Sequence, residues 1–265
     1  SSQYLSALMM LAPTLSEGLQ IQLTSSLASV GYAAMTADMM QKLGARVDFA
    51  PPVVKVAPTG YSRAAVWQVE ADYSAASYWF AAAALAPKPL QIQLQGLKPQ
   101  SLQPDAAVVD IFARFGISSE FNDEGLRITR RSAAPVAPEA WSYDFATCPD
   151  IAQTLAVVCA ALGVQAHLTG LQTLRIKETD RIGALQTELA RFGVVTEAGS
   201  DWLRIAARKG ALQPPSSAVQ TYEDHRMAMA FAPMVLRCGA MEIAHDEVVA
   251  KSYPHFWADW QRWQP

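Results

Sequence analysis

The segment LQIQLQGL, residues 90–97, alternates apolar and polar side chains and predicts a short β-strand. Three similar segments occur elsewhere in the chain: LQIQLTSS at 19–26, VQAHLTGL at 164–171 and AMEIAHDE at 240–247. Their starts are spaced by about 71, 74 and 76 residues, and an apolar helix rich in Ala, Met and Leu precedes each one. We therefore expect one structural unit to repeat along the chain.

A second repeated pattern follows three of these segments and predicts the rest of the unit. QKLGARVDF at 41–49, ARFGISSEF at 113–121 and ARFGVVTEA at 190–198 each end an amphipathic helix at glycine, which adopts positive φ easily, and then enter a strand. The unit is therefore helix, strand, helix, strand, strand, which gives a mixed α and β (α+β) fold. The least repetitive join lies near Asp72, where we place a domain boundary.

The helix that ends at Gly193 has an apolar stripe with steps of three and four residues. The stripe is formed by Ile182, Leu185, Leu189 and Phe192. Glu188 and Arg191 fall outside it, and we expect them on the solvent side of the helix.

Composition and charge exclude several classes of protein. The 265 residues are 51% hydrophobic, and a formal net charge of −3 offers no broad basic surface for a nucleic acid. Cys148, Cys159 and Cys238 are odd in number and widely spaced, which favours a reducing, cytoplasmic location over a disulfide framework. The longest apolar runs are shorter than the roughly 20 residues that a membrane helix needs, so we expect no membrane insertion.

The segment LRIKETDRIGAL, residues 174–185, concentrates both signs of charge where a helix is expected to begin. Lys177 and Arg181 share a helix face and repel by a few tenths of a kcal/mol. Their place near a helix start is also unfavourable for cations by roughly 0.3–1 kcal/mol. Glu178 and Asp180 offset part of this penalty. Two interpretations remain open, a solvated first turn and an anion-binding site.

Three other helix starts carry similar residues. In TYEDHRMAMAF, residues 221–231, Asp224 is a good N-cap and is followed at once by His225 and Arg226. FATCPDIAQTL, residues 145–155, places Asp150 beside a proline at a helix start, and AKSYPHF, residues 250–256, presents Lys251. Each feature alone is compatible with ordinary capping or solvent exposure. If repeated units bring these ends to one rim, the set can hold a doubly charged anion and move a proton.

Five segments together resemble those of the EPSP synthase (3-phosphoshikimate 1-carboxyvinyltransferase) family: LRIKETDRI, DHRMAMAF, SSQYLSALMMLAP, DFATCPD and AKSYPHFW. The resemblance implies an enolpyruvyl transferase-like fold of two lobes, each an inside-out α/β barrel of three βαβαββ units. Residues 1–71 would be the last unit of an incomplete first lobe, and residues 72–265 a second lobe of about three units. The chain would then be part of a longer protein, and we expect it to have little or no turnover alone.

The implied reaction transfers the enolpyruvyl group of phosphoenolpyruvate to the 5-hydroxyl of shikimate 3-phosphate, without a metal or organic cofactor, in a monomeric enzyme. The resemblance assigns proton transfer to Asp150 and Glu178, with possible support from Asp224 and His225. It assigns phosphoenolpyruvate binding to Arg181, Arg226 and Lys251. It assigns the binding of shikimate 3-phosphate to Ser1, Ser2, Gln3, Ser29, Tyr32 and Lys177.

Three segments depart from the family's pattern. Val30-Gly31 stands where a basic residue and proline are common, which we expect to loosen the local backbone. Thr173 and Glu223 each replace a common asparagine. Two other functions remain as alternatives: enolpyruvyl transfer to a nucleotide sugar, and a non-catalytic anion-binding module of repeated units.

Overall fold

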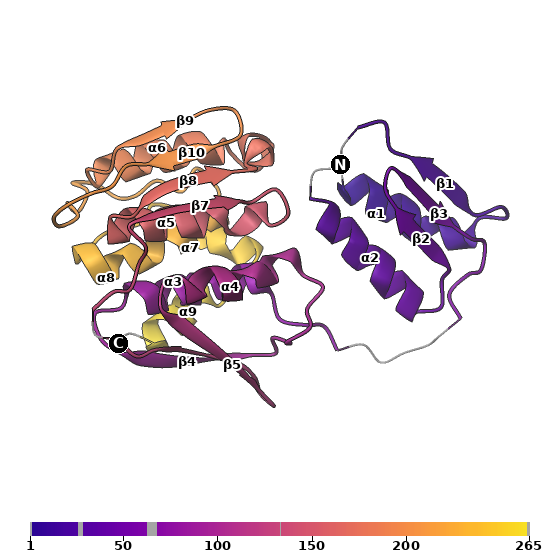
Figure 1. The fold of residues 1–265 in the computed structure, drawn as a ribbon, viewed down its shortest axis with the longest axis horizontal. Coiled ribbons are helices and arrows are strands. Elements are labelled where there is room, and N and C mark those ends of the chain that lie inside the picture. The colour runs from indigo at the N-terminus through magenta and orange to yellow at the C-terminus, as the bar shows by residue number, and fades with distance from the viewer. Residues whose placement is uncertain (1, 26–28, 63–67, 133, 264–265) are drawn as a thin grey trace. The chain divides into compact units, whose positions relative to one another are not determined.

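The computed structural model describes residues 2–25, 29–62, 68–132 and 134–263 and shows a mixed fold of helices and sheets (Figure 1). The chain divides into two compact units. Unit 1 contains residues 1–70 and 101–104, and unit 2 contains residues 71–100 and 105–265. The prediction of a mixed α and β fold is confirmed.

Unit 1 contains one copy of the predicted helix, strand, helix, strand, strand unit. Its elements are α1 (Ser2–Leu11), β1 (Leu19–Gln22), α2 (Val30–Lys42), β2 (Val47–Ala50) and β3 (Val53–Val56), with a 3-10 turn η1 (Ala12–Thr14) after α1. The strands form an antiparallel sheet in the order β1-β3-β2. One face of each helix meets this sheet in a small core that includes Met9, Met40 and Val54.

The first repeat of unit 2 has the same order of elements. It consists of α3 (Tyr73–Leu85), β4 (Leu90–Gln95), η2 (Pro104–Ala107), α4 (Val108–Ala113), β5 (Ile117–Asn122) and β6 (Gly125–Arg130). The strands pair antiparallel in the order β4-β6-β5, and Leu94 of the opening segment pairs with Leu126. The period-two pattern therefore did predict a strand.

The second repeat of unit 2 is a full βαβαββ unit. Its elements are β7 (Ala140–Asp144), η3 (Pro149–Ile151), α5 (Ala152–Leu162), β8 (Gln165–Thr169), η4 (Gln172–Ile176), α6 (Arg181–Arg191), β9 (Thr196–Ala198) and β10 (Leu203–Ile205). The sheet order is β7-β8-β10-β9, with β7 parallel to β8 and the other pairs antiparallel. Gly193 follows α6 with φ of +76°, as expected for a left-handed helix end.

The last part of unit 2 corrects the fourth predicted strand. It contains α7 (His225–Phe231), η5 (Ala232–Met234), α8 (Val235–Cys238), η6 (Asp246–Lys251) and α9 (Phe256–Trp263). AMEIAHDE, residues 240–247, forms no strand in the described chain, and Ile243 makes only an isolated parallel bridge to Val219. Alternating polarity stabilises a strand only where a neighbouring strand supplies its hydrogen bonds, so the local pattern was insufficient here.

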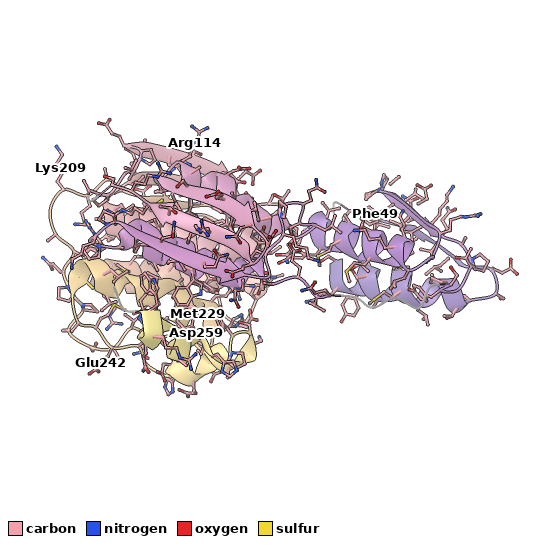
Figure 2. All side chains as sticks on the ribbon, turned by 90° about the horizontal axis from the view of Figure 1, so that it is seen from below. Phe49, Arg114, Lys209, Met229, Glu242 and Asp259 are labelled. Carbon is pink, nitrogen blue, oxygen red and sulfur yellow. The ribbon has the colours of Figure 1, made fainter. Side chains whose placement is uncertain are left out.

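Several helices of unit 2 lie between its two sheets. Figure 1 shows α3, α4, α5 and α7 between the sheet containing β7 to β10 and the sheet containing β4 to β6. Helices α3 and α5 are buried on almost all sides, which explains their Ala-rich, nearly uniformly apolar sequences. In Figure 2, Met229 of α7 lies within the packed region, whereas Lys209 and Arg114 extend into solvent.

Two local predictions can be compared with the packing of α6. The stripe of Ile182, Leu185 and Leu189 is buried, as predicted. Glu188 is also buried, so its predicted place on the solvent side was wrong. A buried carboxylate is stable where hydrogen-bond donors or cations surround it. Arg191, the Gln220 backbone N and the Tyr222 hydroxyl donate to Glu188. Among the described residues, no helix has both the length and the apolar character needed to cross a membrane.

Candidate functional site

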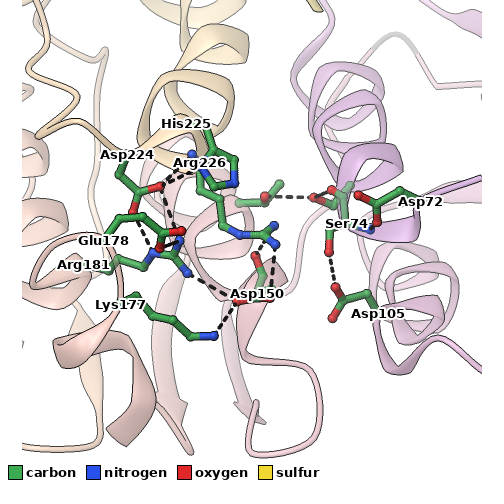
Figure 3. A network of polar contacts seen from close by, with 12 residues as sticks. Asp72, Ser74, Asp105, Asp150, Lys177, Glu178, Arg181, Asp224, His225 and Arg226 are labelled. Atoms are coloured by element: carbon green, nitrogen blue, oxygen red, sulfur yellow. Dashed lines mark hydrogen bonds and ion pairs between the residues drawn. The ribbon is translucent and has the colours of Figure 1, made fainter. Parts of the chain in front are cut away.

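The predicted site residues of unit 2 gather at the ends of four separate elements, as Figure 3 shows for most of them. Asp150 lies in η3, Lys177 and Glu178 in the turn between η4 and α6, and Arg181 opens α6. Asp224 caps the start of α7, with His225 and Arg226 in its first turn, and Lys251 ends η6. Segments separated by up to about a hundred residues therefore meet in one polar cluster.

Arg181 lies at the centre of this cluster, with only 1% of its side chain exposed. Its Nε donates to Asp224 Oδ2 at 2.6 Å, its Nη2 to Glu178 Oε2 at 2.6 Å and its Nη1 to Asp150 Oδ1 at 3.3 Å. The planar guanidinium presents donors in fixed directions, so one side chain orients three carboxylates. This explains why an arginine is favourable at a helix start that would otherwise disfavour a cation.

Asp150 is surrounded by three cations. Its carboxylate lies 3.1 Å from Arg226 Nη2, 3.3 Å from Arg181 Nη1 and 3.7 Å from Lys177 Nζ. Burial alone would raise the pKa of Asp150, but Arg226, Lys177 and Arg181 outweigh burial and hold it below the usual value. Asp150 is therefore a carboxylate at neutral pH.

Glu178 links Arg181 to Lys251, whose Nζ donates to Glu178 Oε1. Burial would raise the pKa of Glu178, but the hydrogen bond from Lys251 and the charge of Arg181 lower it to about 2. The Lys251 side chain is 56% exposed, so this cation also faces solvent. Arg181, Arg226 and Lys251 thus point toward shared carboxylates, and their role in binding phosphoenolpyruvate stays a prediction.

The start of α7 is fixed by Asp224, which is fully buried. Its Oδ1 accepts a hydrogen bond from the Arg226 backbone N at 2.8 Å, which confirms the predicted N-cap. Arg226 also donates to the Asp150 backbone O at 3.3 Å and to the Tyr78 hydroxyl at 3.4 Å. Burial and the neighbouring Arg226 lower the pKa of His225, which favours its neutral form at pH 7.

The structure adds residues that the sequence did not single out. Asp105 is 2% exposed and accepts a hydrogen bond from Ser74 Oγ, while Asp72 caps α3 (Figure 3). Burial, assisted by the charge of Asp150, raises the pKa of Asp105 to about 6. In the sequence, Asp72 and Asp105 look like ordinary helix caps, and no local signal distinguishes them from other such residues.

The remaining predicted site residues belong to unit 1, and Ser1 lies outside the described residues. Ser2 and Gln3 begin α1, Ser29 precedes α2 with φ of +58°, and Tyr32 lies in the first turn of α2. Their joint action with the cluster in unit 2 stays a prediction.

The position of Gly31 has a packing reason. A Cβ there would lie 2.6 Å from Pro104 Cγ, so glycine allows Pro104, also of unit 1, to approach closely. This contact restrains the backbone that we expected to be loose. Of the other two departures, Thr173 Oγ1 is buried without a hydrogen-bond partner among the described residues, and Glu223 adopts a φ of +58°.

Comparisons with known proteins agree with the resemblance stated above. A sequence model of the EPSP synthase (3-phosphoshikimate 1-carboxyvinyltransferase) family matches residues 1–260. The chain belongs to the EPSP synthase family. Among curated family members, the 3-phosphoshikimate 1-carboxyvinyltransferase of Bacteroides fragilis is 40% identical over 260 residues, covering 98% of this chain and 62% of the relative. That of Syntrophobacter fumaroxidans is 38% identical over 264 residues, covering 99% of this chain and 60% of the relative.

Solved structures show the same fold. An EPSP synthase from Acinetobacter baumannii superposes with a TM-score of 0.73 at 20% identity, covering 96% of this chain and 58% of that one. The enolpyruvyl transferase NikO from Streptomyces tendae gives a TM-score of 0.61 at 16% identity, covering 94% of this chain and 56% of that one. The chain therefore spans about three fifths of the length of the EPSP synthases that it matches.

Proposed function

We propose that these 265 residues form part of an enzyme that transfers the enolpyruvyl group of phosphoenolpyruvate to the 5-hydroxyl of shikimate 3-phosphate. The products are 5-enolpyruvylshikimate 3-phosphate and phosphate, on the route to chorismate and the aromatic amino acids. The observation that supports this most is the cluster in which Arg181, Arg226 and Lys251 meet Asp150 and Glu178. Membership of the EPSP synthase family supplies the substrates.

Phosphoenolpyruvate carries a phosphate and a carboxylate, and the cluster offers cations of graded accessibility. Lys251 and Lys177 have 56% and 33% of their side chains exposed, whereas Arg226 has 14%. A ligand would meet the lysines first and the forked guanidinium of Arg226 next. Arg181 is nearly inaccessible, so in this state it acts by holding the carboxylates in place.

The reaction also requires two proton movements. As the 5-hydroxyl oxygen attacks C2 of phosphoenolpyruvate, the hydroxyl proton leaves and another proton is added to the methylene C3, which gives a tetrahedral intermediate. Loss of phosphate and of one C3 proton then restores the double bond. We assign these transfers to Asp150 and Glu178, although their low pKa values make them weak bases before substrate binds.

Binding of the anion would change that. If the phosphate or carboxylate of the substrate takes Lys251 and Arg226 as partners, Glu178 and Asp150 lose part of the positive charge that lowers their pKa values. The pKa of each carboxyl group would then rise toward the range in which it can accept and return a proton. Substrate binding would thus convert structural ion pairs into acid-base groups.

The test is a phosphate-release assay on a protein of the relatives' full length that contains these residues. Phosphate release from phosphoenolpyruvate should require shikimate 3-phosphate and should not occur with a uridine diphosphate sugar as acceptor. Substitution of Glu178 by Gln should reduce kcat by at least about a hundredfold, as expected for loss of an acid-base group. Release with the nucleotide sugar alone, or none with either acceptor, would contradict the proposal.

A further inference from the structure

Helix α6 carries a second polar group away from the cluster. Glu188 lies about two turns after Arg181, and its side chain is 1% exposed. It accepts hydrogen bonds from the Gln220 backbone N at 3.2 Å and the Tyr222 hydroxyl at 2.8 Å, and it pairs with Arg191. A carboxylate in an apolar interior is unfavourable unless several donors surround it, and here three do.

Arg191 extends the same attachment along the chain. Its Nη1 donates to the Ala218 backbone O at 3.0 Å, and its Nη2 to the backbone O and Oγ of Ser217 at 2.5 and 2.7 Å. Glu188 and Arg191 are three residues apart, so both project from one side of α6. Together they bind the segment of residues 217–222 from end to end.

The segment of residues 217–222 needs the bonds to Glu188 and Arg191 because the backbone conformation at its end is energetically unfavourable. Tyr222 and Glu223 have φ of +53° and +58°, two successive non-glycine residues in the left-handed region. Strained conformations of this kind persist only where surrounding contacts determine them. The hydrogen bonds from Tyr222 and Gln220 to Glu188 are contacts of this kind. Burial together with the hydrogen bond to Glu188 also raises the pKa of Tyr222.

The strained pair directly precedes Asp224, which connects the segment to the proposed site. The Asp224 backbone N donates to the Thr221 backbone O at 2.9 Å and closes the turn. The Asp224 carboxylate then holds the Arg226 backbone N at 2.8 Å and Arg181 Nε at 2.6 Å. The direction of the Asp224 side chain, and with it the place of both arginines, follows from the conformation at residues 222 and 223.

We propose that Glu188 is a positioning residue for the cluster, acting through Tyr222 and the strained turn on Asp224, Arg181 and Arg226. Among the described residues, Glu188 forms no ion pair with Arg181 or Arg226. The conformational part of this inference stands independently, whereas its effect on turnover rests on the proposed function. Helix α6 would then organise the site twice, by carrying Arg181 at its start and by holding the turn before α7.

Hydrogen exchange on the 265-residue chain tests the conformational part. In Glu188→Gln, which loses the negative charge but keeps the shape, the Arg226 amide should exchange at least tenfold faster than in the wild type. Glu197→Gln, the same change at an exposed position on β9, is the matched control and should leave this exchange unchanged. Tyr222→Phe removes a single hydroxyl donor and should give a smaller increase. Unchanged exchange at residues 224–227 in both Glu188→Gln and Tyr222→Phe would overturn the proposal.

A rescue experiment separates positioning from general destabilisation. Glycine accepts the left-handed conformation, so Glu223→Gly should lower the need for the attachment. Added to Glu188→Gln, it should restore most of the protection at Arg226. In the full-length protein, Glu188→Gln should lower kcat roughly tenfold with KM nearly constant. The double variant should recover at least half of that loss in kcat. If the double variant recovered neither the amide protection at Arg226 nor kcat, the proposed action of Glu188 through the strained turn would be overturned. A wild-type protein that releases no phosphate would contradict only the proposed function.

Discussion

Replacement of Arg181 by methionine should strongly destabilise unit 2. The side chain is 1% exposed and its guanidinium bonds three carboxylates, of which Asp224 is fully buried. Methionine fills a similar space but leaves these negative charges close together without their common cation. Removing one partner of a buried ion pair costs about 3–5 kcal/mol, and we expect a loss in that range for Arg181→Met.

A double-mutant cycle identifies the cause of that loss. Asp224→Asn removes the most deeply buried negative charge, and asparagine still caps a helix well. The double variant Arg181→Met, Asp224→Asn should therefore be more stable than Arg181→Met by about 1–3 kcal/mol. Arg181→Lys, which keeps the charge but loses the forked geometry, should be intermediate and provides a milder change if the methionine variant does not fold.

Urea unfolding followed by tryptophan fluorescence measures these effects. Six of the seven tryptophans fall within unit 2, so the signal reports chiefly on that unit. The difference in free energy follows from the shift in the urea midpoint. A loss below about 1 kcal/mol for Arg181→Met would match an exposed ion pair and refute the reasoning, as would strict additivity of the two substitutions.

Three further outcomes follow from the pKa values. Lys251→Met should raise the pKa of Glu178 from about 2 by roughly one unit, measured by carboxyl carbon NMR, and an unchanged titration would show that Lys251 has no such role. Burial raises the pKa of Asp105 to about 6 in the folded state. The contribution of Asp105 to the free energy of unfolding is therefore fully present below a pH of about 3.8, and it is lost as the pH rises through about 6. At pH 8, Asp105→Asn should therefore be more stable to urea than the wild type, with a free energy of unfolding higher by up to about 3 kcal/mol. At pH 3.5 the two proteins should be equally stable, and an equal gain in stability at both pH values would contradict this. In the full-length protein, phosphoenolpyruvate binding at pH 5 should take up more protons, or release fewer, in the wild type than in Glu178→Gln, seen by calorimetry in buffers of different ionisation enthalpy; the same proton count in both would contradict the proposed exchange of partners.

The repeated unit was predictable because its signals are local. Alternation in LQIQLQGL and the apolar period of three to four before Gly193 depend only on neighbouring residues, and both gave the observed elements. The strand predicted at 240–247 was wrong because a strand also needs a neighbour, which the segment itself does not specify. Glu188 was placed on the wrong side of α6 because two of its three donors, Gln220 and Tyr222, come from a segment more than 30 residues away in the sequence.

By itself, the sequence determined which charged residues stand at helix starts, since capping and periodicity are properties of a few adjacent residues. It also carried the segments that identify the EPSP synthase family. Only the tertiary structure decided that Arg181 is buried among three carboxylates, that Asp105 joins Ser74, and that α6 holds the strained turn before Asp224. The reason is physical: the energy of a charge depends on its distance from other charges and on its exposure to water, and folding sets both.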